Sequence, residues 1–185
     1  MITIVHGGQT GVDRGAHEGA LNNGWRIMGY MPRNARDELG KIPEIVAQFL
    51  VPHDQPGLAA RTEANVRSAA AVLIIVRAED NPRATPGTAK TLDLAVLRRL
   101  PWKITDPKTD PVKIARWIWE ILLAPGTLPL PLETSSNAQG SILPRLLIAG
   151  PRESKWPGAQ IETMSLLHRI ALALTAITST PKVSP

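Results

Sequence analysis

The chain lacks cysteine altogether, and it contains one phenylalanine and one tyrosine among 185 residues. Without thiols it can form no disulfide, no cysteine zinc site and no thiolate nucleophile. With so few of these aromatic rings, the chain offers few surfaces on which the bases of a single-stranded nucleic acid could stack. The net charge of +5 favours anionic partners, but the basic residues are dispersed, with Arg98 and Arg99 as their one adjacent pair. A nucleic-acid partner is therefore not expected.

Long apolar runs are also missing. No continuous run reaches the roughly 18 residues of a membrane span, and the N-terminus has no basic region followed by an apolar one. We therefore expect a cytoplasmic protein with no membrane partner. The four histidines have no spacing suited to a metal site, so no protein-bound metal is expected.

Length and composition indicate one globular domain. Hydrophobic residues make up 43% of the chain and charged residues 20%, which is close to the globular average. We expect a single ligand-binding domain over 1–178, with a proline-rich surface loop at 125–144 and a tail at 179–185.

Short β-branched runs alternate with longer amphipathic stretches, and this pattern predicts an α/β fold. We expect a Rossmann-like, mostly parallel central sheet with helices on both faces. The run 70–76 is apolar throughout, which is typical of a central strand covered on both sides. The predicted strands are 2–6, 26–30, 49–52, 71–76, 102–105 and 145–149. The predicted helices are 12–23, 57–68, 88–100, 111–123 and 158–177.

The turn between the first strand and the first helix is the most informative segment. Three glycines give its backbone conformations that other residues avoid, so several N–H groups can point at one spot. The helix that follows adds its unpaired N–H groups and the positive end of its dipole. The segment predicts an oxyanion site that comprises Gly7, Gly8, Gln9, Thr10, Gly11, Asp13 and Arg14.

Two familiar phosphate-binding signatures do not fit this turn. It lacks the Gly-Lys-Ser/Thr ending of an ATPase phosphate loop, and Gly-x-Gly-x-x-Gly cannot be aligned with it. A glycine in a strand-to-helix turn is also common for purely structural reasons. The polar side chains clustered at this helix start favour the binding interpretation over the structural one.

Two later junctions should meet the first at the same sheet edge, because ligands of open parallel sheets bind beyond the carboxyl ends of the strands. Gly87 and Thr88 open one helix, although Thr88 also suits an ordinary helix cap. The other junction ends a short apolar strand and offers an arginine suited to phosphate, against the alternative of a simple surface turn. Its candidate residues are Gly150, Arg152, Glu153 and Ser154.

The helix before the central strand contributes further candidates. Arg61 and Asn65 are separated by one helical turn and share a face, with Glu63 between them. A solvated, salt-bridged face is the competing interpretation.

With these blocks placed, the chain resembles the molybdenum carrier protein family, within the LOG-type Rossmann-like nucleotide-binding superfamily. The resemblance spans almost the whole chain and rests on four blocks in order: 7–16, 61–66, 87–92 and 149–158. It implies a homo-oligomer, a dimer or tetramer, that holds a phosphorylated small molecule at the strand ends. The ligand that the resemblance implies is the one suggested for its namesakes, the molybdenum cofactor (molybdopterin), and a nucleotide is the alternative ligand.

Two positions depart from the patterns of these relatives. His6 stands where a small residue is usual, which predicts an additional imidazole near the ligand. LOG-type hydrolases have a catalytic glutamate three residues after the threonine of the glycine-threonine loop, where this chain has Thr91. A threonine cannot replace that carboxylate. We therefore expect a binding protein, with a nucleotide-processing enzyme that uses Asp13 or Glu63, or a nucleotide-sensing module, as alternatives.

Overall fold

The computed structural model describes residues 1–127 and 143–179, and its centre is a five-stranded parallel sheet. The strand order is β2-β1-β9-β7-β8. Because β9 pairs with both β1 and β7, the segments that follow these three strands leave the sheet at one edge. The strands are β1 (Thr3–Val5), β2 (Arg26–Met28), β7 (Ala71–Ile75), β8 (Trp102–Thr105) and β9 (Arg145–Ala149).

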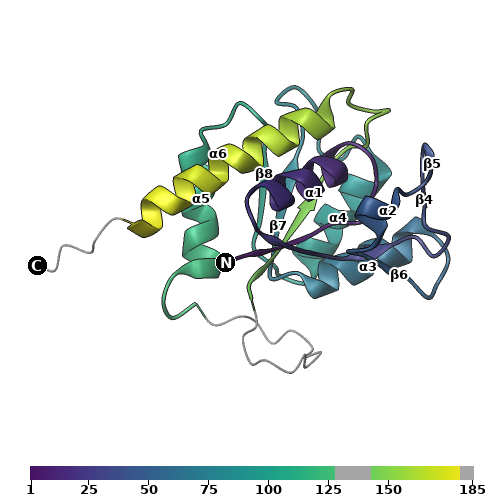
Figure 1. Ribbon diagram of the computed structural model, residues 1–185, viewed down its shortest axis with the longest axis horizontal. Helices are drawn as coiled ribbons and strands as arrows, with labels where there is room; N and C mark the ends of the chain where they lie inside the picture. Colours follow the sequence, from purple (N-terminus) through teal and green to yellow (C-terminus); the bar gives the residue numbers. More distant parts are fainter. Residues whose placement is uncertain (128–142, 180–185) are drawn as a thin grey trace, which may run out of the picture.

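Helices cover both faces of this sheet, which confirms the predicted Rossmann-like fold (Figure 1). On one face lie α1 (Val12–Asn22), α5 (Pro111–Ile118) and α6 (Ala159–Ser179). On the other lie α3 (Leu58–Ser68) and α4 (Pro86–Leu97). Alternate residues of each central strand enter the two separate cores, as the two-residue period of a strand requires.

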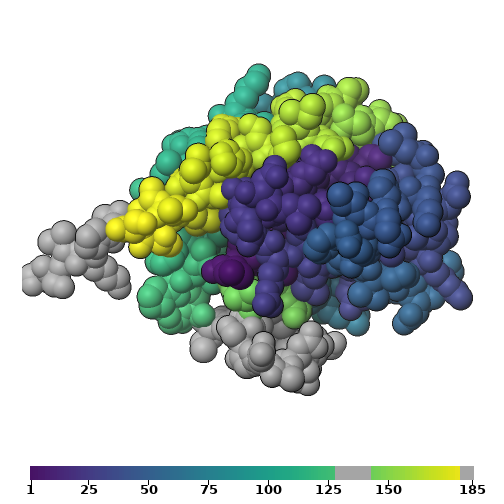
Figure 2. Space-filling view, viewed as in Figure 1, coloured from purple at the N-terminus to yellow at the C-terminus, as the bar shows by residue number. Residues whose placement is uncertain are grey.

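One helix, α6, is long and apolar enough by length and composition to cross a membrane. In this fold it packs along α1, and Figure 2 shows the two helices side by side on the surface. The contact is close because α1 has glycines there. A Cβ at Gly15 would stand 2.3 Å from the Gln160 carbonyl oxygen, and one at Gly19 would stand 3.0 Å from Leu167. Leu166, Leu167 and Ile170 of α6 are completely buried in the core. The helix therefore forms part of the α/β layers.

Two predicted strands differ from the observed ones. The strand expected over 26–30 breaks at Gly29, where a Cβ would lie 2.0 Å from the His6 carbonyl oxygen. The chain resumes as β3 (Tyr30–Met31), which pairs with β6 (Val51–Pro52) in a separate two-stranded sheet. The strand predicted at 49–52 is thus outside the central sheet.

Between these two strands lie elements that the sequence pattern did not predict. They are the antiparallel hairpin of β4 (Arg36–Asp37) and β5 (Gly40–Lys41), and the short helix α2 (Glu44–Ala47). The helix predicted over 111–123 ends at Ile118 and continues as a π-helical turn, Trp119–Leu123. Residues 128–142 of the predicted loop and 180–185 of the predicted tail lie outside the described residues. Ser179, expected in the tail, is the last residue of α6.

Candidate anion-binding site

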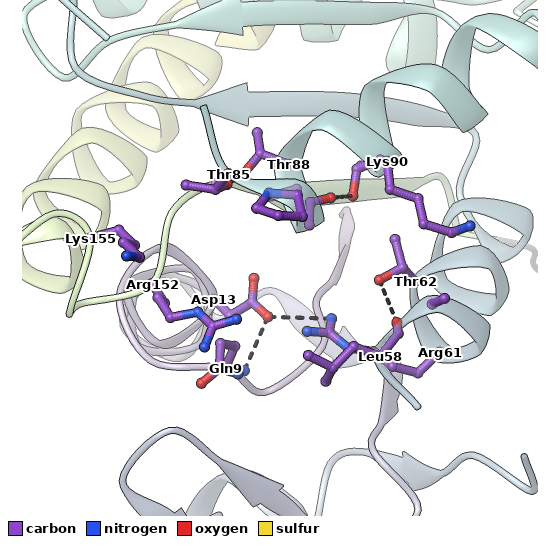
Figure 3. Close-up of a pocket in the computed structure, with 16 residues that line it drawn as sticks. Gln9, Asp13, Leu58, Arg61, Thr62, Thr85, Thr88, Lys90, Arg152 and Lys155 are labelled. Atoms are coloured by element: carbon purple, nitrogen blue, oxygen red, sulfur yellow. Dashed lines mark hydrogen bonds and ion pairs between the residues drawn. The ribbon is translucent and has the colours of Figure 1, made fainter. Parts of the chain in front are cut away.

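The three predicted junctions meet around one cavity of about 410 Å³ (Figure 3). It lies beyond the carboxyl ends of β1, β7 and β9, between the starts of α3 and α4 and the segment 149–155. Each junction contributes to its lining. The lining residues are Gln9, Asp13, Leu58, Ala59, Arg61, Thr62, Thr85, Pro86, Gly87, Thr88, Lys90, Thr91, Ala149, Gly150, Arg152 and Lys155.

Two helices begin at this cavity without a side-chain cap. The residue before α3 is Gly57, which has no side chain to offer, and the residue before α4 is Thr85. The Thr85 hydroxyl donates a 2.7 Å hydrogen bond to the Thr88 hydroxyl and does not cap the helix. N–H groups in the first turn of a helix have no acceptor within it, and the helix dipole adds positive potential there. Both helix starts therefore favour an anion in the cavity.

Arg61 is the most unusual residue of the lining. Its side chain is only 14% exposed, yet its Nε is buried without a hydrogen-bond partner. The carboxylate paired with it is Asp13, at 3.8 Å between Nη1 and Oδ2, which is an ion pair beyond hydrogen-bond distance. A buried guanidinium normally has its donors satisfied, and leaving one unsatisfied is costly. In Figure 3 a dashed line marks the ion pair between Arg61 and Asp13.

The charges around the cavity are mostly positive. Arg61, Lys90, Arg152 and Lys155 line it, and Asp13 is the one carboxylate among the described lining residues. Lys90 and Lys155 are exposed, whereas Arg152 is intermediate and lies 3.7 Å from Glu38. The lining therefore suits a ligand group that bears more than one negative charge.

The glycine turn itself differs from the expected open cradle. Its N–H groups already bind acceptors of the chain: Gly7 and Gln9 each donate to Asp13 Oδ2 at 3.1 Å. Gly8 donates to His6 Nδ1 at 3.1 Å, and Thr10 donates to the Gln9 side-chain oxygen at 3.0 Å. Burial raises the pKa of Asp13, while Arg61 and the two N–H groups act to lower it. The turn therefore binds an internal carboxylate, and the free helix starts lie at α3 and α4.

Two glycines of the turn are required for packing. Gly8 has φ +74°, and a Cβ there would lie 2.7 Å from Leu50. Gly11 has φ +69°, and a Cβ there would lie 2.6 Å from the Glu153 backbone nitrogen. Gly11 thus brings the first and third junctions into contact. Neither glycine lines the cavity.

His6 does not reach the cavity, contrary to expectation. It is completely buried, and its Nε2 lies 3.3 Å from Nδ1 of His17, which is also buried. Burial lowers the pKa of His6, and the neighbouring His17 and Arg61 act in the same direction, so that the pKa falls to about 3. Both rings pack behind the glycine turn, so the additional imidazole supports the turn from inside.

Several predicted site residues hold the neighbouring hairpin instead of lining the cavity. Arg14 Nη2 lies 2.5 Å from Asp37 Oδ2. The Thr10 hydroxyl donates to Glu38, and the backbone N–H and hydroxyl of Ser154 donate to the same carboxylate. These bonds fix the β4–β5 hairpin against two of the three junctions.

Three more predicted residues have structural contacts. Glu153 accepts hydrogen bonds from the backbone N–H groups of Gly158 and Gln160, so it caps the start of α6. On α3, Glu63 is partly exposed and pairs with Arg67, as the solvated-face interpretation predicted. Asn65 bonds both backbone groups of Tyr30, at 2.7 and 3.0 Å, and so stabilises the chain where β2 gives way to β3. None of the three lines the cavity.

Sequence reasoning did not single out Leu58 and Lys90 as part of the lining. Leu58 follows directly on Gly57 at the start of α3, and Lys90 lies one turn after Gly87 on α4. Their positions near helix starts that face the same sheet edge were the available signal. Thr91, where the resemblance places a catalytic glutamate, also lines the cavity and donates a 3.0 Å hydrogen bond to the Gly87 carbonyl.

Comparison with known proteins relates this geometry to one family. Residues 4–124 match the sequence profile of the "Circularly permutated YpsA SLOG family". Among solved structures, the chain is similar to the "Putative molybdenum carrier protein" of Syntrophus aciditrophicus SB. The two are 26% identical with a TM-score of 0.69, and the similarity covers 92% of this chain and 94% of that one. No curated protein matches the chain.

Proposed function

The chain belongs to the circularly permuted YpsA SLOG family, and on that premise we propose that it binds a phosphorylated small molecule in the 410 Å³ cavity. The observation that supports this most directly is Arg61, which lines the cavity with an Nε that has no hydrogen-bond partner, in a lining that also includes the uncapped starts of α3 and α4. Phosphate oxygens would accept from Arg61 and from the helix N–H groups. Lys90, Arg152 and Lys155 would balance the remaining charge.

Within this proposal the molybdenum cofactor is the cargo, and the protein is its carrier. The name of the similar Syntrophus protein supports that assignment. The lining suits the phosphate end of such a molecule, while Leu58, 46% exposed, offers an apolar surface to a ring. The chain has no cysteine to bind the metal, so the dithiolene of the ligand itself would retain it. A nucleotide, like the molybdenum cofactor, has a phosphate and a ring, so it is the alternative ligand.

We propose binding without hydrolysis. Asp13, the one carboxylate among the described lining residues, already accepts from two backbone N–H groups. Glu63, the other carboxylate considered for catalysis, pairs with Arg67 outside the cavity. Incubation with adenosine monophosphate should release no adenine above the buffer rate, measured by chromatography. Release that Asp13→Asn abolishes would instead make the protein an enzyme.

The phosphate site is tested by titrating the protein with inorganic phosphate and following the amide resonances of Gly87 and Thr88 by NMR. Arg61→Ala should weaken phosphate binding by roughly 1.5 to 3 kcal/mol, because a charge-assisted hydrogen bond is lost. Arg67→Ala is the matched control, since it removes an exposed arginine from the same helix. Equal affinities in wild type and Arg61→Ala would reject the site.

Ligand identity requires a separate measurement. The protein is purified from cells, denatured, and its small-molecule fraction is analysed by mass spectrometry. The carrier proposal expects a pterin with a phosphate group, bound by wild type and lost in Arg61→Ala. A bound nucleotide would favour the alternative ligand.

A cytoplasmic homo-oligomer remains part of the proposal. Val96, Leu97 and Trp102, near the end of α4 and the start of β8, expose apolar side chains that a second subunit could cover. Light scattering during size-exclusion chromatography measures the assembly directly.

A further inference from the structure

A second cavity, of about 640 Å³, adjoins the first. Three residues line both cavities: Gln9, Leu58 and Arg152. In Figure 3 these residues lie across the first cavity from Thr85 and Thr88. A ligand that passes Arg152 on this side would leave the first cavity and enter the second.

The far wall of the second cavity is the segment 32–38, which leads into the β4–β5 hairpin. This segment is fixed in place by the Glu38 carboxylate, which accepts hydrogen bonds from Thr10 and Ser154. The Arg14–Asp37 ion pair fixes the hairpin at a further point. The second cavity is therefore formed before any ligand binds.

The available charge in the second cavity is positive. Its carboxylates, Asp37 and Glu38, are already engaged by the bonds that hold the hairpin. Arg33 and Arg36 line the same cavity with exposed side chains, and neither forms an ion pair among the described residues. Two arginines without an ion-pair partner can donate hydrogen bonds to the oxygens of an anion, as the arginines of phosphate sites do.

From this juxtaposition we propose that the natural ligand has two separate anionic groups and occupies both cavities. One group lies at Arg61 and the starts of α3 and α4, and the other lies at Arg33 and Arg36. Arg152 lies beside the part of the ligand that joins them. The ligand class is thus an elongated molecule with an anionic group at each end. This inference rests on the proposed function of the first cavity.

The inference is tested without knowledge of the natural ligand, by titration with a series of straight-chain alkane bisphosphates and with the alkyl monophosphate of each length. A molecule that reaches both cavities binds its second phosphate at high local concentration, so affinity should rise steeply at the spanning length. We expect a gain of roughly tenfold or more over the matched monophosphate. Calorimetry measures both affinities.

The double variant Arg33→Ala/Arg36→Ala should remove this gain and leave monophosphate affinity unchanged. The control double variant Arg26→Ala/Arg98→Ala removes the same charge from two exposed arginines that line neither cavity, and it should retain the gain. A bisphosphate series that never exceeds the monophosphates would overturn the two-anion proposal. So would a gain that survives in Arg33→Ala/Arg36→Ala. Failure of the proposed function would give a different result from failure of the two-anion proposal. If the first cavity were not a phosphate site, Arg61→Ala would leave monophosphate affinity unchanged.

Discussion

The Arg61 guanidinium lies directly on Gly7. A Cβ added to Gly7 would stand 1.6 Å from Arg61 Nη1 and 2.4 Å from Cζ. Glycine at this position leaves room for an arginine that comes from another helix, α3. The glycine turn thus contributes to the site by leaving space for the Arg61 guanidinium.

Gly7→Ala should therefore displace Arg61 and weaken phosphate binding about as much as Arg61→Ala does. The φ of Gly7 lies outside the left-handed region, and the obstructing atoms are the end of a flexible side chain, so the fold should persist. Phosphate titration of Gly7→Ala, Arg61→Ala and the double variant measures the effect. If the two changes act through one group, the double variant binds no worse than Arg61→Ala. Additive losses would contradict this account.

Stability should fall as the pH drops below about 6.5, partly because of His6. The folded protein keeps His6 neutral, with its pKa lowered to about 3, whereas the unfolded chain takes up a proton near pH 6.5. The stability that neutral His6 contributes is present above pH 6.5 and is lost progressively toward pH 3, at roughly 1 kcal/mol per pH unit. Burial lowers the pKa of His17 also, which acts in the same direction.

Urea unfolding at pH 7, 6 and 5 measures this dependence. His6→Asn keeps an acceptor for the Gly8 N–H but does not titrate, so its free energy of unfolding should fall less steeply with pH. Asp13 is present in both proteins, and its raised pKa works in the opposite direction. Parallel pH dependences in wild type and His6→Asn would show that His6 does not cause the loss.

Glu153→Ala should lower stability without lowering phosphate affinity. Its carboxylate accepts from Gly158 and Gln160 at the start of α6, and loss of such a cap costs about 1 to 2 kcal/mol. Urea unfolding and phosphate titration of the same variant separate the two roles. Glu153→Gln retains an acceptor and should lose less. Weaker phosphate binding at unchanged stability would show that Glu153 contacts the ligand and does not act as a cap.

Much of the fold could be predicted from local sequence patterns. The apolar run at 70–76 predicted the buried central strand, and the alternation around it predicted parallel strands with helices on both faces. The break in the strand at Gly29 could not be predicted from the sequence, because it depends on close contact with the His6 carbonyl, which follows a neighbouring strand. The β4–β5 hairpin was missed as well, since its strands are two residues each and their support comes from Thr10, Arg14 and Ser154.

The sequence by itself determined the sheet edge where three glycine-containing junctions would meet, because strand direction and turn positions follow from short-range backbone preferences and burial. Only the tertiary structure decided which donors at that edge remain free. Asp13 fills the glycine turn from within, while Arg61 comes from α3 with its Nε unpaired. A hydrogen-bond donor is satisfied by whichever acceptor the packed chain brings within hydrogen-bond distance, and that depends on contacts between residues far apart in sequence.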